Sequence, residues 1–303
     1  MKKTFKYTFL AINLMFILFM FLGCTSNKSI EYNGQKINVP KSIERIISTA
    51  PSNTEVLIDL GLSDKIVAID KYSSDVEGLK GNIEKLDFSN PDAEKIIKLN
   101  PDIIIASSHN KTETGQDPFK AIEEAGIPVV YIPSSTSIDG IYNDIKFISS
   151  LFSKDEKGNE IIANMKKEIN SIQDISKNIK NKKKVYFEIG SSPNLFSFGE
   201  GTFLNEMIEI VGAENIFKDK KQWISPTEES VIKSNPDVIL TNEGYIENAT
   251  NIIKARNGWE NINAIKNNNV YMIDMNSSSR PSQHIIKALK EMAKSIYPEY
   301  YEK

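Results

Sequence analysis

The sequence predicts an α/β protein of two similar parallel-sheet lobes, joined by one long helix, with a ligand cleft between the lobes. Three observations lead to this prediction. Short β-branched runs alternate with amphipathic helices in both halves of the chain, a pattern typical of a parallel sheet covered on both faces. One long helical stripe interrupts that alternation in the middle of the chain, and the two halves are similar in sequence at an offset of 135 residues.

The chain opens with a leader, residues 1–23. Three lysines fall within its first seven positions, and an almost uninterrupted apolar run of fifteen residues follows, Thr8–Leu22. This pattern is typical of a secretory signal, and the run is shorter than the roughly 20 residues of a membrane span. Leu22-Gly23-Cys24 resembles a bacterial lipobox, which implies a lipid on Cys24 and a place on the extracytoplasmic face of the cell membrane. The alternative is a cleaved signal beside an incidental cysteine.

The mature chain is expected to hold an N-terminal lobe at 24–152, a linker helix at 153–183 and a C-terminal lobe at 184–303. Apolar runs predict four strands in the first lobe, at 46–48, 66–69, 103–106 and 129–132. Its predicted helices lie at 53–60 and 118–125, and each is followed by glycine.

The linker is predicted from apolar residues that recur at three- and four-residue steps on a polar background. They are Ile161, Met165, Ile169, Ile172, Ile175 and Ile179. One amphipathic helix of about 25 residues, or about 37 Å, accounts for this spacing. Beyond it the strand and helix alternation resumes, with strands at 185–189, 238–241 and 270–273, a helix at 203–211 and a last helix with an apolar stripe from Ile285 to Ile296.

An internal repeat links the two lobes. Asn90–Ile105 and Ser225–Leu240 share eight identical residues in sixteen positions. In each copy a capping residue, Asn90 or Ser225, precedes a proline that we expect at the first helical position. Each predicted helix ends before Asn-Pro-Asp and leads into an apolar strand, so the two lobes should be built alike.

Composition excludes several classes of protein. The net charge of −3 gives no electrostatic footprint for nucleic acid. One cysteine and two histidines are too few for a disulfide framework or a Cys-rich zinc site, and they make a bare metal site unexpected. Nucleophile-elbow, zinc-protease and phosphate-loop motifs do not occur, so we expect neither an enzyme nor a resident cofactor.

Several segments together resemble one known family. They are Arg45-Ile46-Ile47-Ser48, Pro51–Glu55, Gly212–Phe217, the two Asn-Pro-Asp elements and Arg280-Pro281. In this order the chain is similar to the helix-linked substrate-binding lipoproteins of ABC importers for cobalamin, ferric siderophores and haem. The resemblance implies a surface receptor that passes a chelated metal complex to a permease and its ATPase, with a corrinoid favoured over a ferric siderophore or haem. A ligand-free surface adhesion lipoprotein on the same fold is the alternative from another class.

The resemblance also assigns a docking role to Glu94 and Glu229. Each stands seven residues before the proline of its Asn-Pro-Asp element, at equivalent places in the repeat. In the family such glutamates pair with arginines of the permease. The alternative is that both only complement the dipole of a helix first turn.

Candidate cleft residues come from predicted loops. Tyr72, Phe88, Phe196 and Trp223 match positions that line the pocket of cobalamin-binding relatives, and flat rings suit a macrocycle; the alternative is ordinary lobe core. Arg280 would offer a planar donor fork to an anionic or carbonyl-rich ligand, unless a nearby acid pairs with it. His284 and His109 are candidates for an axial metal ligand, although a lone histidine is more often solvated or part of the core.

Overall fold

The computed structural model describes residues 28–32, 34–88, 90–110 and 118–301. The leader and Cys24 lie outside these residues. The chain divides into two compact units, residues 1–42 and 43–303. The first contains an antiparallel hairpin of β1 (Lys28–Tyr32) and β2 (Gln35–Val39), and the second contains every element described below.

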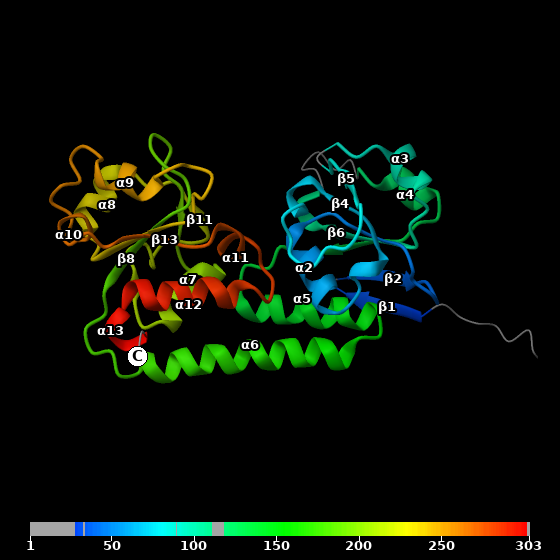
Figure 1. Ribbon diagram of the computed structural model, residues 1–303, viewed down its shortest axis with the longest axis horizontal. Helices are drawn as coiled ribbons and strands as arrows, with labels where there is room; N and C mark the ends of the chain where they lie inside the picture. The colour runs from blue at the N-terminus through cyan, green and yellow to red at the C-terminus, as the bar shows by residue number, and fades with distance from the viewer. Residues whose placement is uncertain (1–27, 33, 89, 111–117, 302–303) are drawn as a thin grey trace, which may run out of the picture. The chain divides into compact units, whose positions relative to one another are not determined.

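The N-terminal lobe is built on a five-stranded parallel sheet of order β5-β4-β3-β6-β7 (Figure 1). Its strands are β3 (Ile46–Ser48), β4 (Ile66–Asp70), β5 (Glu84–Leu86), β6 (Ile103–Ser107) and β7 (Val129–Ile132). Its helices are α2 (Pro51–Asp59), α3 (Ala93–Lys98) and α4 (Lys120–Glu124), with single 3₁₀ turns η1 (Ser63–Lys65), η2 (Lys71–Ser73) and η3 (Ser108–Asn110). Every residue of β3, β6 and β7 is buried, which explains their uninterrupted apolar sequence.

The C-terminal lobe repeats this plan with a four-stranded parallel sheet of order β10-β8-β12-β13. The strands are β8 (Lys184–Glu188), β10 (Glu214–Asn215), β12 (Val238–Thr241) and β13 (Val270–Met272), and a separate antiparallel pair is formed by β9 (Ser197–Phe198) and β11 (Trp223–Ile224). The helices are α7 (Phe203–Ile210), α8 (Glu228–Ser234), α9 (Ala249–Lys254), α10 (Asn263–Lys266), α11 (Met275–Ser279), α12 (Ile285–Ile296) and α13 (Pro298–Tyr301).

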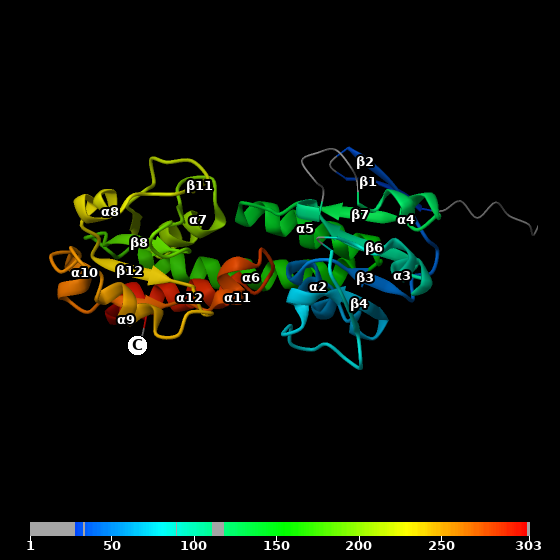
Figure 2. The same cartoon turned by 90° about the horizontal axis from the view of Figure 1, so that it is seen from above.

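Two antiparallel-running helices, α5 (Ile138–Leu151) and α6 (Asp155–Ser176), connect the lobes. The predicted apolar stripe is real over Ile161, Met165, Ile169 and Ile172, which are all buried. The helix has 22 residues and ends at Ser176, earlier than expected. Ile175 is the last residue of the stripe within it, and Ile179 is buried in the segment that follows. The N-terminal part of α6 packs against α5 of the first lobe. Its C-terminal part packs against α7 and α12 of the second lobe (Figures 1 and 2). No helix was predicted from the sequence at the position of α5.

The caps of the repeated helices differ from expectation. Asn90 and Ser225 do not cap them; Asp92 accepts a hydrogen bond from the backbone N–H of Lys95, and Thr227 accepts one from Ser230. Aspartate and threonine are both favoured capping residues, and Asp92 and Thr227 stand directly before their helices. Pro91 and Pro226 therefore precede the caps and are not the first helical residues. The repeat itself is kept, since α3 and α8 occupy equivalent places before β6 and β12.

The fold class predicted from the sequence is therefore confirmed: two parallel-sheet lobes with a long helix beside both. Within the described part of the chain, no helix combines the length and hydrophobicity needed to cross a membrane.

Candidate functional site

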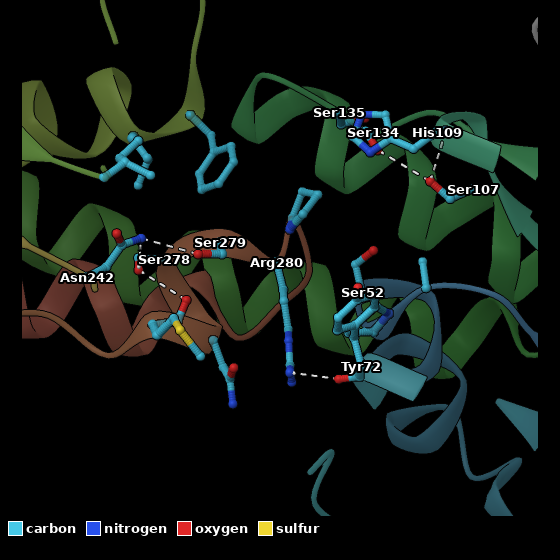
Figure 3. A pocket seen from close by; sticks show the side chains of 18 of the residues that line it. Ser52, Tyr72, Ser107, His109, Ser134, Ser135, Asn242, Ser278, Ser279 and Arg280 are labelled. Atoms are coloured by element: carbon cyan, nitrogen blue, oxygen red, sulfur yellow. Dashed lines mark hydrogen bonds between the residues drawn. The ribbon is translucent and has the colours of Figure 1, made fainter. Parts of the chain in front are cut away.

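A cavity of about 850 Å³ lies where the two lobes of residues 43–303 meet (Figure 3). The N-terminal lobe contributes residues that follow β3, β4, β6 and β7, and the C-terminal lobe contributes residues that follow β8, β12 and β13. The carboxyl ends of parallel strands are the usual ligand-binding edge of an α/β sheet. The volume is within the range of small-molecule sites, about 300–1,000 Å³.

One wall of the cavity is aromatic. Phe196 and Trp223 stack with ring centroids 6.0 Å apart and planes 16° apart, although their side chains are 38% and 42% exposed. The pairing of β9 with β11 fixes this pair, because Trp223 lies opposite Phe198 and packs edge-on against its ring. Tyr72 lines the cavity from the other lobe and is 66% exposed. The structure thus brings three of the four predicted aromatic residues into the cavity.

Phe88 is placed elsewhere. It is 4% exposed and belongs to the hydrophobic core of the N-terminal lobe, where its ring stacks on Phe119 at 6.0 Å. It is not among the residues that line the cavity. The expectation that Phe88 contacts a ligand is corrected accordingly, because its ring is packed in the apolar cluster of the N-terminal lobe against Phe119.

The rest of the lining is rich in small polar side chains, which sequence reasoning missed. They are Ser52, Ser74, Ser107, Ser134, Ser135, Thr136, Asn242, Asn276, Ser278 and Ser279. Figure 3 shows the two groups on opposite sides of Arg280: Ser107, Ser134 and Ser135 on one, Asn242, Ser278 and Ser279 on the other. The signal was present, since Ser107, Ser134 and Asn242 each come just after a buried apolar strand. Hydroxyl and amide groups of this kind recognise neutral hydrogen-bonding ligands.

His109, from η3, is one of these lining residues. Its Nδ1 lies 3.2 Å from the hydroxyl oxygen of Ser134, and its backbone N–H donates to the Ser107 hydroxyl oxygen. Ser107 and Ser134 approach each other at 3.5 Å, so the three side chains form one small network (Figure 3). The hydrogen bond at Nδ1 orients the ring and leaves Nε2 as the nitrogen that a metal centre could bind.

His284 does not line this cavity. It faces a smaller pocket of about 410 Å³, where its Nε2 lies 3.3 Å from Asp59 and its Nδ1 3.7 Å from Glu55. Both ring nitrogens therefore face carboxylates of α2. The hydrogen bond with Asp59, ahead of the burial that opposes it, raises the pKa of His284 above its ordinary value. This arrangement corrects the expectation that His284 is free to act as an axial ligand.

Arg280 lines the cavity, but its guanidinium is already paired. Nη1 lies 3.0 Å from Glu55, and Nη2 lies 2.7 Å from Asp75 and donates to the carbonyl oxygen of Tyr72. All three partners belong to the N-terminal lobe, so the side chain joins the lobes. Although burial opposes it, bonding to Asp75 and Glu55 raises the pKa of Arg280 above its usual value. The alternative weighed for this residue, an arginine paired with acids, is what the structure contains.

Further polar contacts surround Glu55 and extend this joint. Ser282 donates its hydroxyl to the Glu55 carboxylate, and Gln283 donates to the Glu55 carbonyl oxygen and to Asp59. At a separate point, Glu206 of α7 accepts a hydrogen bond from the backbone N–H of Ile138, at the start of α5. Burial raises the pKa of Glu206. The lobes are thus tied by directed polar contacts at two places.

The charged residues that line the cavity, within the described chain, are Lys71, Asp75 and Arg280, besides His109. The Lys71 ammonium lies 2.8 Å from Asp87, and Arg280 is shared by two carboxylates. The cavity therefore presents cations that are already neutralised. Across residues 28–32, 34–88, 90–110 and 118–301, no group of three or more His, Cys, Asp or Glu side chains is arranged to hold a bare metal ion.

The two predicted docking residues lie apart from the cavity. Glu94 is exposed in the first turn of α3, and Glu229 is exposed in the first turn of α8. Hydrogen bonds from its own backbone and from Thr227 lower the pKa of Glu229. Both carboxylates thus face solvent at equivalent positions of the repeat.

Comparisons with known proteins agree with this architecture. A family model described as "Periplasmic binding protein" matches residues 46–276. An uncharacterized ABC transporter substrate-binding lipoprotein of Bacillus subtilis, YvrC, is 32% identical over 89% of this chain and 85% of its own length. A vitamin B12-binding protein of Vibrio campbellii is 27% identical over 82% of this chain and 88% of its own. The crystal structure of a possible iron-binding (periplasmic solute-binding) protein of Staphylococcus epidermidis superposes with a TM-score of 0.76, at 34% identity, covering 85% of this chain and all of the other.

Proposed function

This chain belongs to the periplasmic binding protein family and is a substrate-binding receptor of an ABC transporter, and from this premise we propose that its ligand is a corrinoid. The single observation that carries the proposal is the stacked pair of Phe196 and Trp223, which stays exposed in a cavity with Tyr72 in the other lobe. Exposed aromatic faces in a cavity between two lobes suit a flat macrocycle, because rigid rings bury a large area at little entropic cost.

The polar lining supports a ligand decorated with amides. Hydroxyls and the two amides of Asn242 and Asn276 surround the aromatic wall, and they can both donate to and accept from carboxamide arms. Lys71 and Arg280 are paired with carboxylates of the protein. An anionic ligand would have to displace these carboxylates to reach either cation. A haem with two propionates or a carboxylate siderophore would gain most from unpaired cations, whereas the cavity lining offers mainly neutral hydrogen-bonding groups.

A second feature concerns the metal within such a ligand. His109 has one ring nitrogen held by Ser134, in the manner of a histidine oriented for coordination through the other. We propose that, in corrinoids that lack their own base, Nε2 of His109 replaces an exchangeable axial ligand of the cobalt, such as water, which leaves for solvent. The other predicted axial residue, His284, is not part of this proposal.

The test is a fluorescence titration of residues 25–303 with cyanocobalamin, dicyanocobinamide, haemin and ferric siderophores, corrected for absorbance by the ligands. The chain has two tryptophans, and Trp259 is fully buried in the C-terminal core, so quenching should come from Trp223. We expect saturable one-to-one quenching by the corrinoids and its loss in W223F. Saturation by haemin or a siderophore instead would assign the receptor to that ligand. Silence from all probes would overturn the corrinoid proposal and point to a ligand outside these classes.

The same proposal covers the rest of the chain. We infer that residues 1–23 are a leader, that Cys24 carries a lipid on the extracytoplasmic face of the cell membrane, and that lobes 24–152 and 184–303 with linker 153–183 make up the mature receptor. We further propose that Glu94 and Glu229 pair with arginines of the permease, which works with its ATPase.

A further inference from the structure

The two carboxylates that hold Arg280 are held differently themselves. Glu55 is 4% exposed, accepts a further hydrogen bond from Ser282 and is anchored through its backbone by Gln283. The side chain of Asp75 is 51% exposed, and its contacts beyond Arg280 include one hydrogen bond from the Asn276 amide at 2.8 Å. Glu55 is therefore a fixed structural partner, whereas Asp75 lies at the edge that a ligand can reach.

Asp75 also occupies the position that an anion would take. It lines the cavity, and its Oδ1 lies 2.7 Å from Nη2 of Arg280, the distance of a charge-assisted hydrogen bond. The adjoining donor, the Asn276 amide, is bound to the other oxygen of the same carboxylate. Asp75 thus uses both of its oxygens as a ligand carboxylate would. Bonding to Arg280 and Asn276 outweighs burial and lowers the pKa of Asp75, so the group stays ionised.

The charge count around this point decides what the cavity can accept. Arg280 contributes one positive charge, and Glu55 and Asp75 contribute two negative charges. In the neighbouring pocket Lys287 pairs with Asp274, and His284 faces both Asp59 and Glu55. Four carboxylates therefore face at most three cationic side chains, Arg280, His284 and Lys287. The floor of the cavity is therefore net negative near its arginine, and like charges repel an approaching anion.

We propose that Asp75 is a specificity-determining residue, which acts as an internal substitute for a ligand carboxylate and so restricts the receptor to chelates without anionic arms. The inference rests on the proposed function, because it names the charge of the ligand that this cavity takes. Specificity of this kind comes from a repulsive element as much as from attractive contacts. Removing the charge should turn Arg280 into an anion site without changing the aromatic wall.

The experiment compares two ligands with the same corrin ring. Dicyanocobinamide carries amide arms, and dicyanocobyrinic acid carries carboxylates in their place. Their dissociation constants are measured by fluorescence for the wild type, D75N and D75S at low and at high salt. D64N is the matched control, since it removes an exposed acid of the same lobe whose ion pair with Lys80 is outside the cavity. R280Q is added to D75N, to show whether any gain depends on the arginine.

We expect the wild type to prefer the amide ligand, and D75N to bind the carboxylate ligand at least tenfold more tightly than the wild type does. The gain should shrink at high salt and disappear in D75N/R280Q, and it should exceed any change in the affinity for dicyanocobinamide in the same variant. D75S removes the same charge, so it should show the same gain for the carboxylate ligand. It replaces D75N in the comparison if D75N proves poorly folded. An unchanged ratio of affinities in both variants, or the same gain in D64N, would overturn the inference while the corrinoid receptor stands. Failure of the wild type to bind either corrin would overturn both.

Discussion

The guanidinium of Arg280 lies 3.0 Å from the carboxylate of Glu55, which is 225 residues away in the sequence and in the other lobe. Both side chains are largely removed from solvent. Removing one member of a buried pair leaves an uncompensated charge, which costs about 3–5 kcal/mol. The contact is therefore one of the ties between the lobes, and its arginine also lines the cavity.

We expect E55Q to lower the free energy of unfolding by about 1–3 kcal/mol, less than the full cost of an uncompensated charge, because Asp75 still pairs with Arg280. Chemical denaturation followed by circular dichroism measures this value. D64N, which breaks an exposed pair with Lys80, should cost less than about 1 kcal/mol. Equal effects of the two substitutions would mean that the Glu55 pair contributes no more than a surface pair.

His284 gives the joint a dependence on pH. Its ring faces Glu55 and Asp59, with Glu77 nearby, and its hydrogen bond with Asp59 raises its pKa in the folded state above 6.5. Folding then favours the protonated ring, so the stabilisation is complete below pH 6.5 and is lost as the pH rises through the folded pKa. We expect the melting temperature of the wild type to exceed that of H284N at pH 6 and to approach it at pH 9. A constant difference between wild type and H284N across the same range would contradict the role given to His284.

Phe196 and Phe88 offer a matched pair of phenylalanines, one exposed in the cavity and one in the core. We expect F196L to weaken binding of dicyanocobinamide about tenfold, which corresponds to about 1.4 kcal/mol, and to leave stability nearly unchanged. F88L should lower the free energy of unfolding by about 1–2 kcal/mol and leave the affinity unchanged. Titration of both variants measures the affinity, and thermal melting measures the stability. Lost affinity in F88L together with lost stability in F196L would reverse the assignment of the two rings.

The sequence was informative wherever one local signal determined the structure. Continuous apolar runs predicted β3, β6, β7, β8 and β12, since strands buried on both faces need no alternation. It was less informative where a side chain finds a partner far along the chain. Nothing near Arg280 shows that Glu55 and Asp75 bind it, because that pairing exists only once the lobes meet. Phe88 and Phe196 are likewise alike in local sequence, and only packing separates core from cavity.

Cys24 allows the lipid anchor to be tested, although it lies outside the described residues. We expect C24A, expressed in a bacterium with a lipoprotein pathway, to appear in the medium or the soluble extracytoplasmic fraction, whereas the wild type stays with the membrane. Metabolic labelling with a fatty acid should mark the wild type alone. Labelling of both proteins, or release of both, would favour a cleaved signal beside an incidental cysteine.

Glu94 and Glu229 test the docking proposal, because they are exposed at equivalent places of the repeat and far from the cavity lining. We expect E94K/E229K to abolish uptake of a labelled corrinoid by cells while its dissociation constant stays unchanged, since Arg–carboxylate pairs to a permease would become repulsive. Each single reversal should reduce uptake in part, because a twofold permease would still bind one lobe. E156K/E247K is the control, as it reverses two other exposed glutamates. Uptake lost in the control would point to net charge as the cause, and a loss of affinity in E94K/E229K would place the two glutamates in the binding site or the fold.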